Sequence, residues 1–263
     1  MFKDKKIFVL GMGKSGKSVA KLLAQDNHVL ITDVKCDNLE EVKELEELGI
    51  NVIITKDQTS IFDDSYDYVV KNPGVKLDHP IVLMAKKFNI PVITELEVAY
   101  RYLPEVKIIG ITGSNGKTTT TTIAYEFLKT AGVSVHLAGN IGLPLCDQIA
   151  DIKKNDVLVV EVSSHQLVNL DKFKADIAVL TNLFQVHLDF FGTYEKYKLN
   201  KLRIFNNQDE NSLAILNKGD EEVCELTKGL KAKKIYFSSK GEADIYIDNG
   251  SIIYNHEKVV ELS

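Results

Sequence analysis

The sequence is poor in cysteine, in long apolar runs and in basic charge. Its three cysteines lie far apart without a Cys-x-x-Cys pair, so we expect neither a disulfide framework nor a cysteine-rich metal site. No apolar run approaches the ~18 residues that a membrane-spanning helix needs, and the N-terminus leads into a predicted strand without the apolar core of a signal peptide. The net charge of −5 argues against a general nucleic-acid binder. We therefore expect a cytoplasmic chain that contacts neither nucleic acid nor a membrane.

A glycine-rich turn at residues 110–118 (GITGSNGKT) stands between a predicted strand and a predicted helix. In such a turn the backbone N–H groups approach phosphate oxygens, and the N-terminus of the following helix adds a positive field. Lys117 can reach the β- and γ-phosphates of a nucleoside triphosphate, and the Thr118 hydroxyl can bind Mg²⁺. The glycines recur every three residues, and Ile111 stands where a standard P-loop has its first glycine. The alternative is a glycine-rich turn with a surface lysine.

A second glycine motif, Gly11-x-Gly13-x-x-Gly16, follows the first predicted strand, and Asp33 ends the second. This pattern resembles a dinucleotide-binding fingerprint, although alone it is a weak signal. A nicotinamide-dependent enzyme and a tight turn without a ligand are the alternatives. Asn72-Pro73-Gly74 ends the fourth predicted strand and is expected at the same carboxyl edge of the sheet, where ligands bind.

The order of predicted elements indicates an α/β chain with two domains, and a content of 44% hydrophobic residues over 263 residues can supply a core to each. Residues 1–103 alternate strands and helices, which predicts a Rossmann-like parallel sheet. Residues 104–263 predict a P-loop NTPase-like domain with a small antiparallel appendage at 234–262. Two local details are also predicted: a capping box from Thr94 to Glu97, and a helix over 119–131 with one apolar side, made of Ile123, Ala124, Phe127 and Leu128.

Polar residues follow several strands of the second domain. Glu161 ends an apolar strand and is expected to bind Mg²⁺ or orient water, with a surface glutamate as the alternative. His187 follows the next strand and is either functional or structural. Asn140 has the alternative of a simple turn residue. Lys201 lies on an amphipathic helix, and residue chemistry alone gives no reason to choose it over Lys198.

Together these motifs resemble the Mur ligases, and the TGSNGKTT loop is specific to Mur ligases and folylpolyglutamate synthases. Within the family, the N-terminal motifs resemble the branch that uses D-glutamate. The matching segments run in family order across almost the whole chain: GMGKSG (11–16), Asp33, NPG (72–74), TELEVAYRYL (94–103), GITGSNGKTTT (110–120), GNIG (139–142), EVSSHQL (161–167), HLD (187–189), GTYEKY (192–197) and KLRIF (201–205).

The resemblance implies an ATP- and Mg²⁺-dependent amide ligase of peptidoglycan precursor synthesis. ATP would phosphorylate the terminal carboxylate of UDP-N-acetylmuramoyl-L-alanine, and the amine of D-glutamate would attack the acyl phosphate. The resemblance also implies the roles of individual residues. Lys117, His187 and Lys201 would be catalytic; Gly113, Asn115, Gly116, Lys117, Thr118 and Thr119 would bind ATP; Lys14, Ser15, Asp33, Asn72, Gly74, Asn140 and Ser163 would bind the UDP-linked substrate; and Thr118, Glu161, His187 and a carbamylated Lys201 would bind metal.

The chain departs from the family pattern in three respects. Family members carry a third domain that binds the amino acid, so we expect this chain to have little ligase activity alone. Val186 stands where the family usually has Asp, and His165 and Val168 replace a usual Phe and Glu. Two further alternatives stay open: another Mur or folylpolyglutamate-type ligase, and a non-catalytic protein that binds the UDP-linked substrate.

Overall fold

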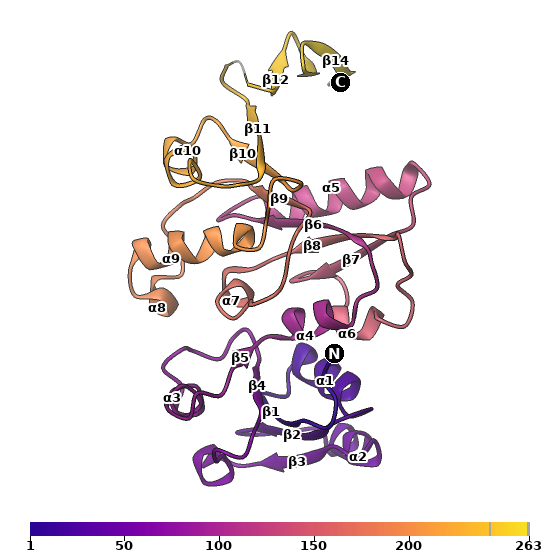
Figure 1. Ribbon diagram of the computed structural model, residues 1–263, viewed down its shortest axis with the longest axis vertical. Helices are drawn as coiled ribbons and strands as arrows, with labels where there is room; N and C mark the ends of the chain where they lie inside the picture. The colour runs from indigo at the N-terminus through magenta and orange to yellow at the C-terminus, as the bar shows by residue number, and fades with distance from the viewer. Residues whose placement is uncertain (242, 262–263) are drawn as a thin grey trace. The chain divides into compact units, whose positions relative to one another are not determined.

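The computed structural model describes residues 1–241 and 243–261, and the chain forms two compact units, whose elements are labelled in Figure 1. Unit 1 combines the N-terminal residues with two later segments, so it is not continuous in sequence. It consists of Met1–Pro104, Gly142–Ile152 and Val168–Phe173, and unit 2 consists of Glu105–Ile141, Lys153–Leu167 and Lys174–Ser263.

Unit 1 is built on a five-stranded sheet in the order β3-β2-β1-β4-β5, with every pair parallel. This confirms the parallel sheet predicted from the alternation of strands and helices. The strand order reverses direction between β1 and β4, and ligands of such sheets bind at the carboxyl ends of the strands at this switch point. The elements are β1 (Lys6–Leu10), α1 (Lys14–Leu23), β2 (His28–Asp33), α2 (Leu39–Glu47), β3 (Asn51–Ile54), η1 (Gln58–Ile61), β4 (Tyr68–Lys71), α3 (Pro80–Lys87), β5 (Val92–Ile93), α4 (Glu95–Tyr102) and α6 (Leu145–Gln148).

Unit 2 is built on a nine-stranded sheet in the order β14-β13-β12-β11-β10-β9-β6-β8-β7. Strand β6, which leads into the 110–118 turn, lies between β9 and β8, so polar residues at the ends of these three strands meet at one edge. The elements are β6 (Lys107–Thr112), α5 (Lys117–Thr130), β7 (Val135–Gly139), β8 (Val157–Glu161), α7 (Ser164–Leu167), β9 (Ile177–Leu180), α8 (Leu188–Phe191), α9 (Tyr194–Lys201), η2 (Leu202–Phe205), β10 (Leu213–Asn217), α10 (Glu221–Leu226), β11 (Lys233–Ser238), β12 (Ile245–Asp248), β13 (Ser251–Tyr254) and β14 (Glu257–Glu261).

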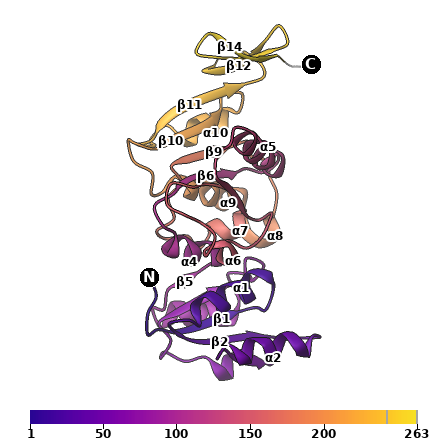
Figure 2. The same cartoon turned by 90° about the vertical axis from the view of Figure 1, so that its right-hand side faces the viewer.

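The predicted antiparallel appendage is present but smaller than expected. Strand β11 pairs in parallel with β10 over its length and in parallel with β12 at its end, so it belongs to the main sheet. Among the described residues, antiparallel pairing is confined to β12 with β13 and β13 with β14, and these three strands form the yellow end of unit 2 in Figure 2. Leu262, which the sequence analysis placed in the last strand, lies outside the described residues.

Helix α5 is less amphipathic than its sequence indicated. Ala124 and Leu128 pack on the apolar cluster of Ile111, Val159 and Val179, as expected for the buried side of the helix. Ile123 and Phe127, however, are 49% and 72% exposed. The predicted apolar side was therefore wrong for these two residues, because the sheet beneath the helix covers a narrower stripe than the sequence pattern suggested.

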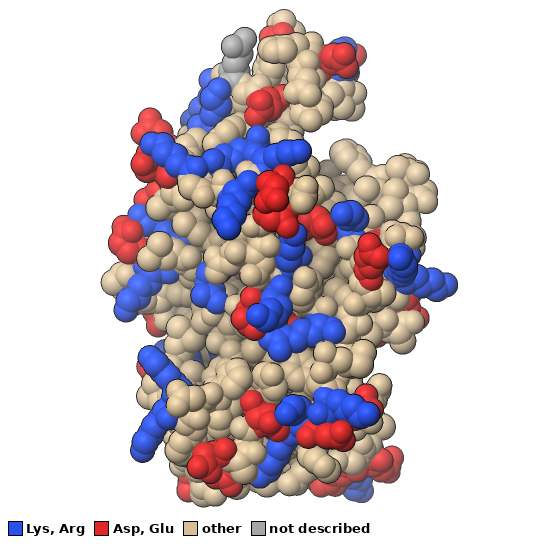
Figure 3. All heavy atoms as spheres, in the orientation of Figure 1, with Lys and Arg blue, Asp and Glu red and all other residues tan. Residues whose placement is uncertain are grey.

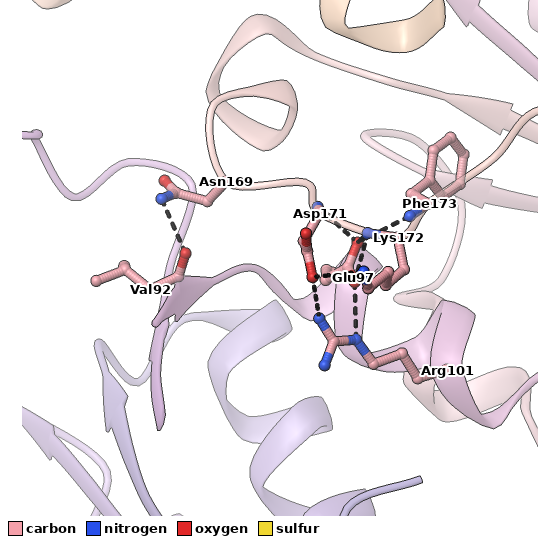
Figure 4. A network of polar contacts seen from close by, with 7 residues as sticks. All are labelled: Val92, Glu97, Arg101, Asn169, Asp171, Lys172 and Phe173. Atoms are coloured by element: carbon pink, nitrogen blue, oxygen red, sulfur yellow. Dashed lines mark hydrogen bonds and ion pairs between the residues drawn. The ribbon is translucent and has the colours of Figure 1, made fainter. Parts of the chain in front are cut away.

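The predicted capping box at the start of α4 was also wrong. Thr94 occupies the N-cap position, but its side chain makes no capping hydrogen bond. The carboxylate of Glu97, which is 0% exposed, instead accepts the backbone N–H groups of Asp171, Lys172 and Phe173 (Figure 4). It also pairs with Arg101, whose Nε lies 2.8 Å from the glutamate Oε1. Glu97 therefore anchors a distant segment of unit 1.

Because unit 1 is discontinuous, a fragment that ends at Pro104 is expected not to fold. Such a fragment lacks the N–H groups of 171–173 that pair with Glu97, and it lacks the N–H of Cys146, which donates to Glu95 at 2.7 Å. Both carboxylates are buried, and a buried acceptor that loses its N–H donors lowers stability even where, as for Glu97, Arg101 remains as a partner. We expect residues 1–104 to show no cooperative urea transition by circular dichroism, whereas the whole chain does. A fragment that unfolds cooperatively would show that the later segments are dispensable.

The surface carries charges of both signs. On the face shown in Figure 3, lysine and arginine side chains are interspersed with aspartate and glutamate, and neither sign dominates the view. In the described part of the chain, no helix has both the length and the apolar character that crossing a bilayer requires.

Candidate functional site

The 110–118 turn has the strand–loop–helix geometry that its sequence predicted. Gly116 precedes α5 in the left-handed region, at φ +80°, so glycine is favoured there. Gly113 has φ +152°, and a Cβ at this position would lie 1.9 Å from Thr181 Oγ1. These two glycines let the turn bend toward β9 and present the first N–H groups of α5 to an incoming anion.

Residues just past β9 hold this turn in place. The side chain of Asn182 accepts the N–H of Asn115 at 2.9 Å, and its backbone carbonyl accepts the N–H of Ser114 at 3.0 Å. The Thr181 hydroxyl donates to the carbonyl of Asn115 at 2.7 Å. Sequence reasoning missed Thr181 and Asn182, although their position after a strand adjacent to β6 was a usable signal.

Lys117 is the first residue of α5, and its side chain folds back over the turn. Its Nζ donates to the carbonyls of Gly113 and Ser114, each at 3.0 Å. The ammonium therefore lies on the inner side of the loop that would enclose the phosphates. Thr119, also predicted to bind ATP, lies exposed in the same helical turn.

A buried carboxylate joins three elements at the sheet edge. Glu161 ends β8 and is 1% exposed. Its Oε2 accepts the Thr118 hydroxyl at 2.8 Å, and its Oε1 accepts the Asn140 side-chain amide at 2.9 Å. Thus Asn140, predicted to contact substrate, also orients Glu161, and the phosphate loop is connected to β8 through a single carboxylate.

Lys201 lies at the end of α9 and is 0% exposed. Its Nζ donates to Thr112 Oγ1 at 3.0 Å, and the Thr112 hydroxyl donates to the carbonyl of Val162. Burial, and next the positive charge of Lys117, hold the pKa of Lys201 well below its usual value, while Glu161 opposes them. The structure thus distinguishes Lys201 from Lys198 on the same helix, because Lys198 forms ion pairs with Glu195 and Glu222.

His187 lies among aromatic rings, whereas Ser163 is hydrogen-bonded to a residue of α7. His187 is an exposed residue at φ +55° that precedes α8, and its ring lies 5.2 Å from that of His165 and 6.4 Å from that of Tyr197, measured between centroids. Tyr197 also lies 5.5 Å from Lys201 Nζ, which connects this aromatic group to the buried lysine. The hydroxyl and N–H of Ser163, which precedes α7, both donate to the side-chain oxygen of Gln166 within that helix.

The donor atoms suit one magnesium ion better than two. A hydroxyl and a carboxylate are the hard oxygen ligands that Mg²⁺ prefers, so Thr118 and Glu161 fit it. The described residues contain no cluster of three or more His, Cys, Asp or Glu side chains that could hold a metal. The Lys201 amine is no ligand for Mg²⁺, so a second ion fits only if a carboxylate is added to that nitrogen.

Unit 1 contains an open hollow of about 440 Å³ at the carboxyl ends of its central strands. Asp33, Asn72 and Gly74, three of the predicted substrate residues, line it, and Gln58 and His79 are lining residues that sequence reasoning missed. The complete lining consists of Leu10, Gly11, Asp33, Val34, Gln58, Asn72, Gly74, Val75 and His79. Of the other predicted residues, Ser15 lines a smaller neighbouring hollow, and Lys14 is exposed at the start of α1.

The first glycine motif is explained by close packing around Asn72. A Cβ on Gly11 or on Gly13 would lie 2.8 Å from the Asn72 side-chain nitrogen, and a Cβ on Gly16 would lie 2.0 Å from the carbonyl oxygen of Gly11. Asp33 accepts the N–H of Met12 at 2.7 Å, so it ties this turn to β2. The turn at residues 11–16 is therefore packed too closely for side chains at its three glycines.

Comparison with known proteins decides the family. Residues 111–262 match the Mur ligase middle domain, and residues 5–94 match the Mur ligase MurD-like N-terminal domain. The chain belongs to the Mur ligase family. It is 41% identical over 268 residues to a UDP-N-acetylmuramoylalanine–D-glutamate ligase of Geobacillus kaustophilus (strain HTA426), and 40% identical over 267 residues to one of Bacillus cereus (strain G9842). Each match covers 100% of this chain but 59% of the relative.

Solved Mur ligase structures share the fold. A UDP-N-acetylmuramate:L-alanyl-γ-D-glutamyl-meso-diaminopimelate ligase from Neisseria meningitides superposes with a TM-score of 0.60 at 18% identity, covering 97% of this chain and 86% of that chain. A UDP-N-acetylmuramate-alanine ligase from Thermotoga maritima superposes with a TM-score of 0.56 at 21% identity, covering 98% and 60%. The predicted order of an N-terminal parallel sheet and a P-loop-type sheet is therefore confirmed as that of the Mur ligase N-terminal and middle domains.

Proposed function

We propose that this chain carries the precursor-binding and ATP-binding parts of a cytoplasmic ligase that joins D-glutamate to UDP-N-acetylmuramoyl-L-alanine. The observation that carries the proposal is the linked set of Lys117, Thr118 and Glu161 at the edge of the unit 2 sheet, in a chain about 40% identical to ligases of that name. The D-glutamate site would lie in the part of the relatives' length that this chain does not span.

The proposed reaction has two steps. A carboxylate oxygen of the precursor attacks the γ-phosphorus of ATP as the bond to ADP breaks, which gives an acyl phosphate. The amine of D-glutamate then attacks the acyl carbon, expels phosphate and loses a proton, which gives the amide. Neither step needs a protein nucleophile, so the residues act by positioning groups and by stabilising charge.

Each unit 2 residue has a role that follows from its contacts. Lys117, freed from the two loop carbonyls, would bind the β- and γ-phosphates. Mg²⁺ bound by Thr118 and Glu161 would neutralise phosphate charge. Asn140 would keep Glu161 in its orientation while the Thr118 hydroxyl turns from the carboxylate to the ligand. The hollow of unit 1, lined by Asp33, Asn72 and Gly74, would bind the uridine diphosphate.

Ligand-linked stabilisation of the purified chain tests this proposal. We expect UDP-N-acetylmuramoyl-L-alanine and Mg-ATP each to raise the thermal midpoint, since a ligand at 100 times its Kd adds about 2.7 kcal/mol of stability. A shift with a folate substrate but not with the precursor would support a folylpolyglutamate-type ligase. Precursor binding without nucleotide binding would support a non-catalytic binding protein, and a shift with NADH alone would support a dehydrogenase.

Lys201 is expected to react with carbon dioxide. Its lowered pKa leaves a larger share of the amine unprotonated than on an exposed lysine, and this amine can add to CO₂ with release of a proton to solvent. In ¹³C-bicarbonate we expect a carbamate resonance near neutral pH that strengthens as the pH rises. Lys201→Met should abolish it, and Lys198→Met, which removes a lysine from the same helix, should not. A resonance that survives in Lys201→Met would assign the carbamate elsewhere.

A further inference from the structure

A buried lysine lies behind the hollow of unit 1. Lys71 ends β4 and is 1% exposed. Its Nζ lies within hydrogen-bond distance of the carbonyl oxygens of Asn72 (3.4 Å), Pro73 (3.5 Å) and Val75 (3.1 Å). Because Asn72, Gly74 and Val75 line the hollow, one ammonium group contacts three backbone carbonyls of this wall segment.

Burying the Lys71 ammonium lowers the stability of the folded chain. Burial lowers the pKa of Lys71 to about 8, which means that the protein disfavours the charged form relative to water. An apolar side chain of similar length would avoid this cost. A residue that lowers stability in its usual charge state, yet organises the wall of a ligand-sized hollow, is expected to serve ligand binding.

We propose that Lys71 is a positioning residue for the ligand of the unit 1 hollow: it holds the 72–75 loop in its binding conformation and supplies positive charge behind it. The chemical class of ligand is a nucleoside diphosphate, and this part rests on the proposed function. Its anionic phosphates would gain from a cation in a poorly hydrated position, where screening is weak. The loop conformation itself depends on Lys71 with or without ligand.

Other titratable groups line the two hollows of unit 1 around the lysine. From α4, Glu95 lines the smaller hollow that Lys71 also lines; its carboxylate accepts the N–H of Cys146, and burial raises its pKa. The α1 residues that line this hollow, Ser15, Gly16 and Val19, carry no charge. In the larger hollow, Asp33 faces the ligand space from β2, and burial lowers the pKa of His79 from 6.5. His79 therefore titrates on the acid side of neutrality, away from Lys71.

The test compares Lys71→Met and Lys71→Arg with Lys76→Met, which removes an exposed lysine from the next part of the same loop. Calorimetry with UDP-N-acetylmuramoyl-L-alanine should show at least about tenfold weaker binding for Lys71→Met, through a looser loop and a lost charge. Its thermal midpoint should stay equal or rise. Lys71→Arg should restore binding, and Lys76→Met should bind like the parent chain.

A pH series adds a second readout. Binding by the parent chain should weaken as the pH rises through 8, because Lys71 loses its charge, whereas Lys71→Arg should show no such step. Glu95→Gln should show the same weakening of binding near pH 8 as the parent chain. This result would assign the pH dependence to Lys71 rather than to Glu95. Without ligand, the NMR amide signals of Asn72, Gly74 and Val75 should titrate in the same range and shift in Lys71→Met.

The outcomes separate the two proposals. If the parent chain binds the precursor and Lys71→Met binds it equally well, or loses affinity only as far as it loses its fold, the positioning role is overturned. If the loop amides neither titrate nor shift in Lys71→Met, it is overturned as well. If the loop amides titrate and shift while neither the parent chain nor any variant binds the precursor, the role of Lys71 in positioning the 72–75 loop stands and the proposed function fails.

Discussion

Glu97→Ala is expected to lower the free energy of unfolding by about 3–5 kcal/mol, the range measured when one partner of a buried pair is removed. The substitution leaves Arg101 without its buried carboxylate and removes the acceptor for the N–H groups of Asp171, Lys172 and Phe173 (Figure 4). Because the Glu97 side chain is 0% exposed, the substitution removes these acceptor oxygens from a buried position. Urea unfolding followed by circular dichroism measures the change.

The same network offers a matched control at its exposed end. Asp171 also pairs with Arg101, at 3.0 Å, but its side chain is 56% exposed. Asp171→Ala should therefore cost no more than about 1 kcal/mol. The loss in free energy of unfolding for Glu97→Gln should lie between those of Glu97→Ala and Asp171→Ala, because an amide oxygen still accepts N–H groups but carries no charge. Equal losses for Glu97→Ala and Asp171→Ala would contradict the anchoring role of Glu97.

Lys117→Met is expected to weaken Mg-ATP binding about 100-fold, which corresponds to roughly 3 kcal/mol for a charge-assisted contact with phosphate. The free chain already places the ammonium 3.0 Å from the Gly113 and Ser114 carbonyls, so the nucleotide gains a cation that needs little rearrangement. Isothermal calorimetry with ATP and with ADP measures the loss. The fold should be little affected, because only two loop contacts disappear.

Lys129→Met is the control for Lys117→Met. It removes one exposed lysine from the last turn of the same helix, and this lysine lies near the Tyr125 ring rather than near the phosphate loop. The two variants share the same change in net charge, so any long-range electrostatic effect is common to both. If both lysines matter equally for binding, the nucleotide does not bind at the 110–118 turn.

The parts of the fold that depend on local pattern could be predicted. Alternating apolar strands and helices predicted both parallel sheets, and the glycine spacing predicted the turn into α5. The exposure of Ile123 and Phe127 could not be predicted, because helical periodicity does not tell how wide a stripe the sheet covers. The parallel pairing of β11 could not be predicted either, since the sequence of a short strand does not tell whether it pairs parallel or antiparallel with its neighbour.

Some residues of the candidate site could likewise be predicted from the sequence, and others could not. Lys117 and Thr118 were evident from their motif, whereas the choice of Lys201 over Lys198 depends on how α9 packs. Glu97 was predicted to be a capping residue, and its backbone partners could not be predicted because they are more than seventy residues away. Two contiguous domains, 1–103 and 104–263, stay a prediction; the middle-domain match at 111–262 includes the segments 142–152 and 168–173 that pack within unit 1.

The discontinuity of unit 1 has a consequence for synthesis on the ribosome. When Pro104 has emerged, all five strands of its sheet and Arg101 are present, but the three backbone N–H groups that donate to Glu97 have not been made. Translation of residues 105–173 takes roughly 3–14 s at about 5–20 residues per second. Through that interval the Glu97 carboxylate on α4 has Arg101 as a partner but lacks its three N–H donors. The first unit to be translated is therefore completed only after the phosphate loop has been made.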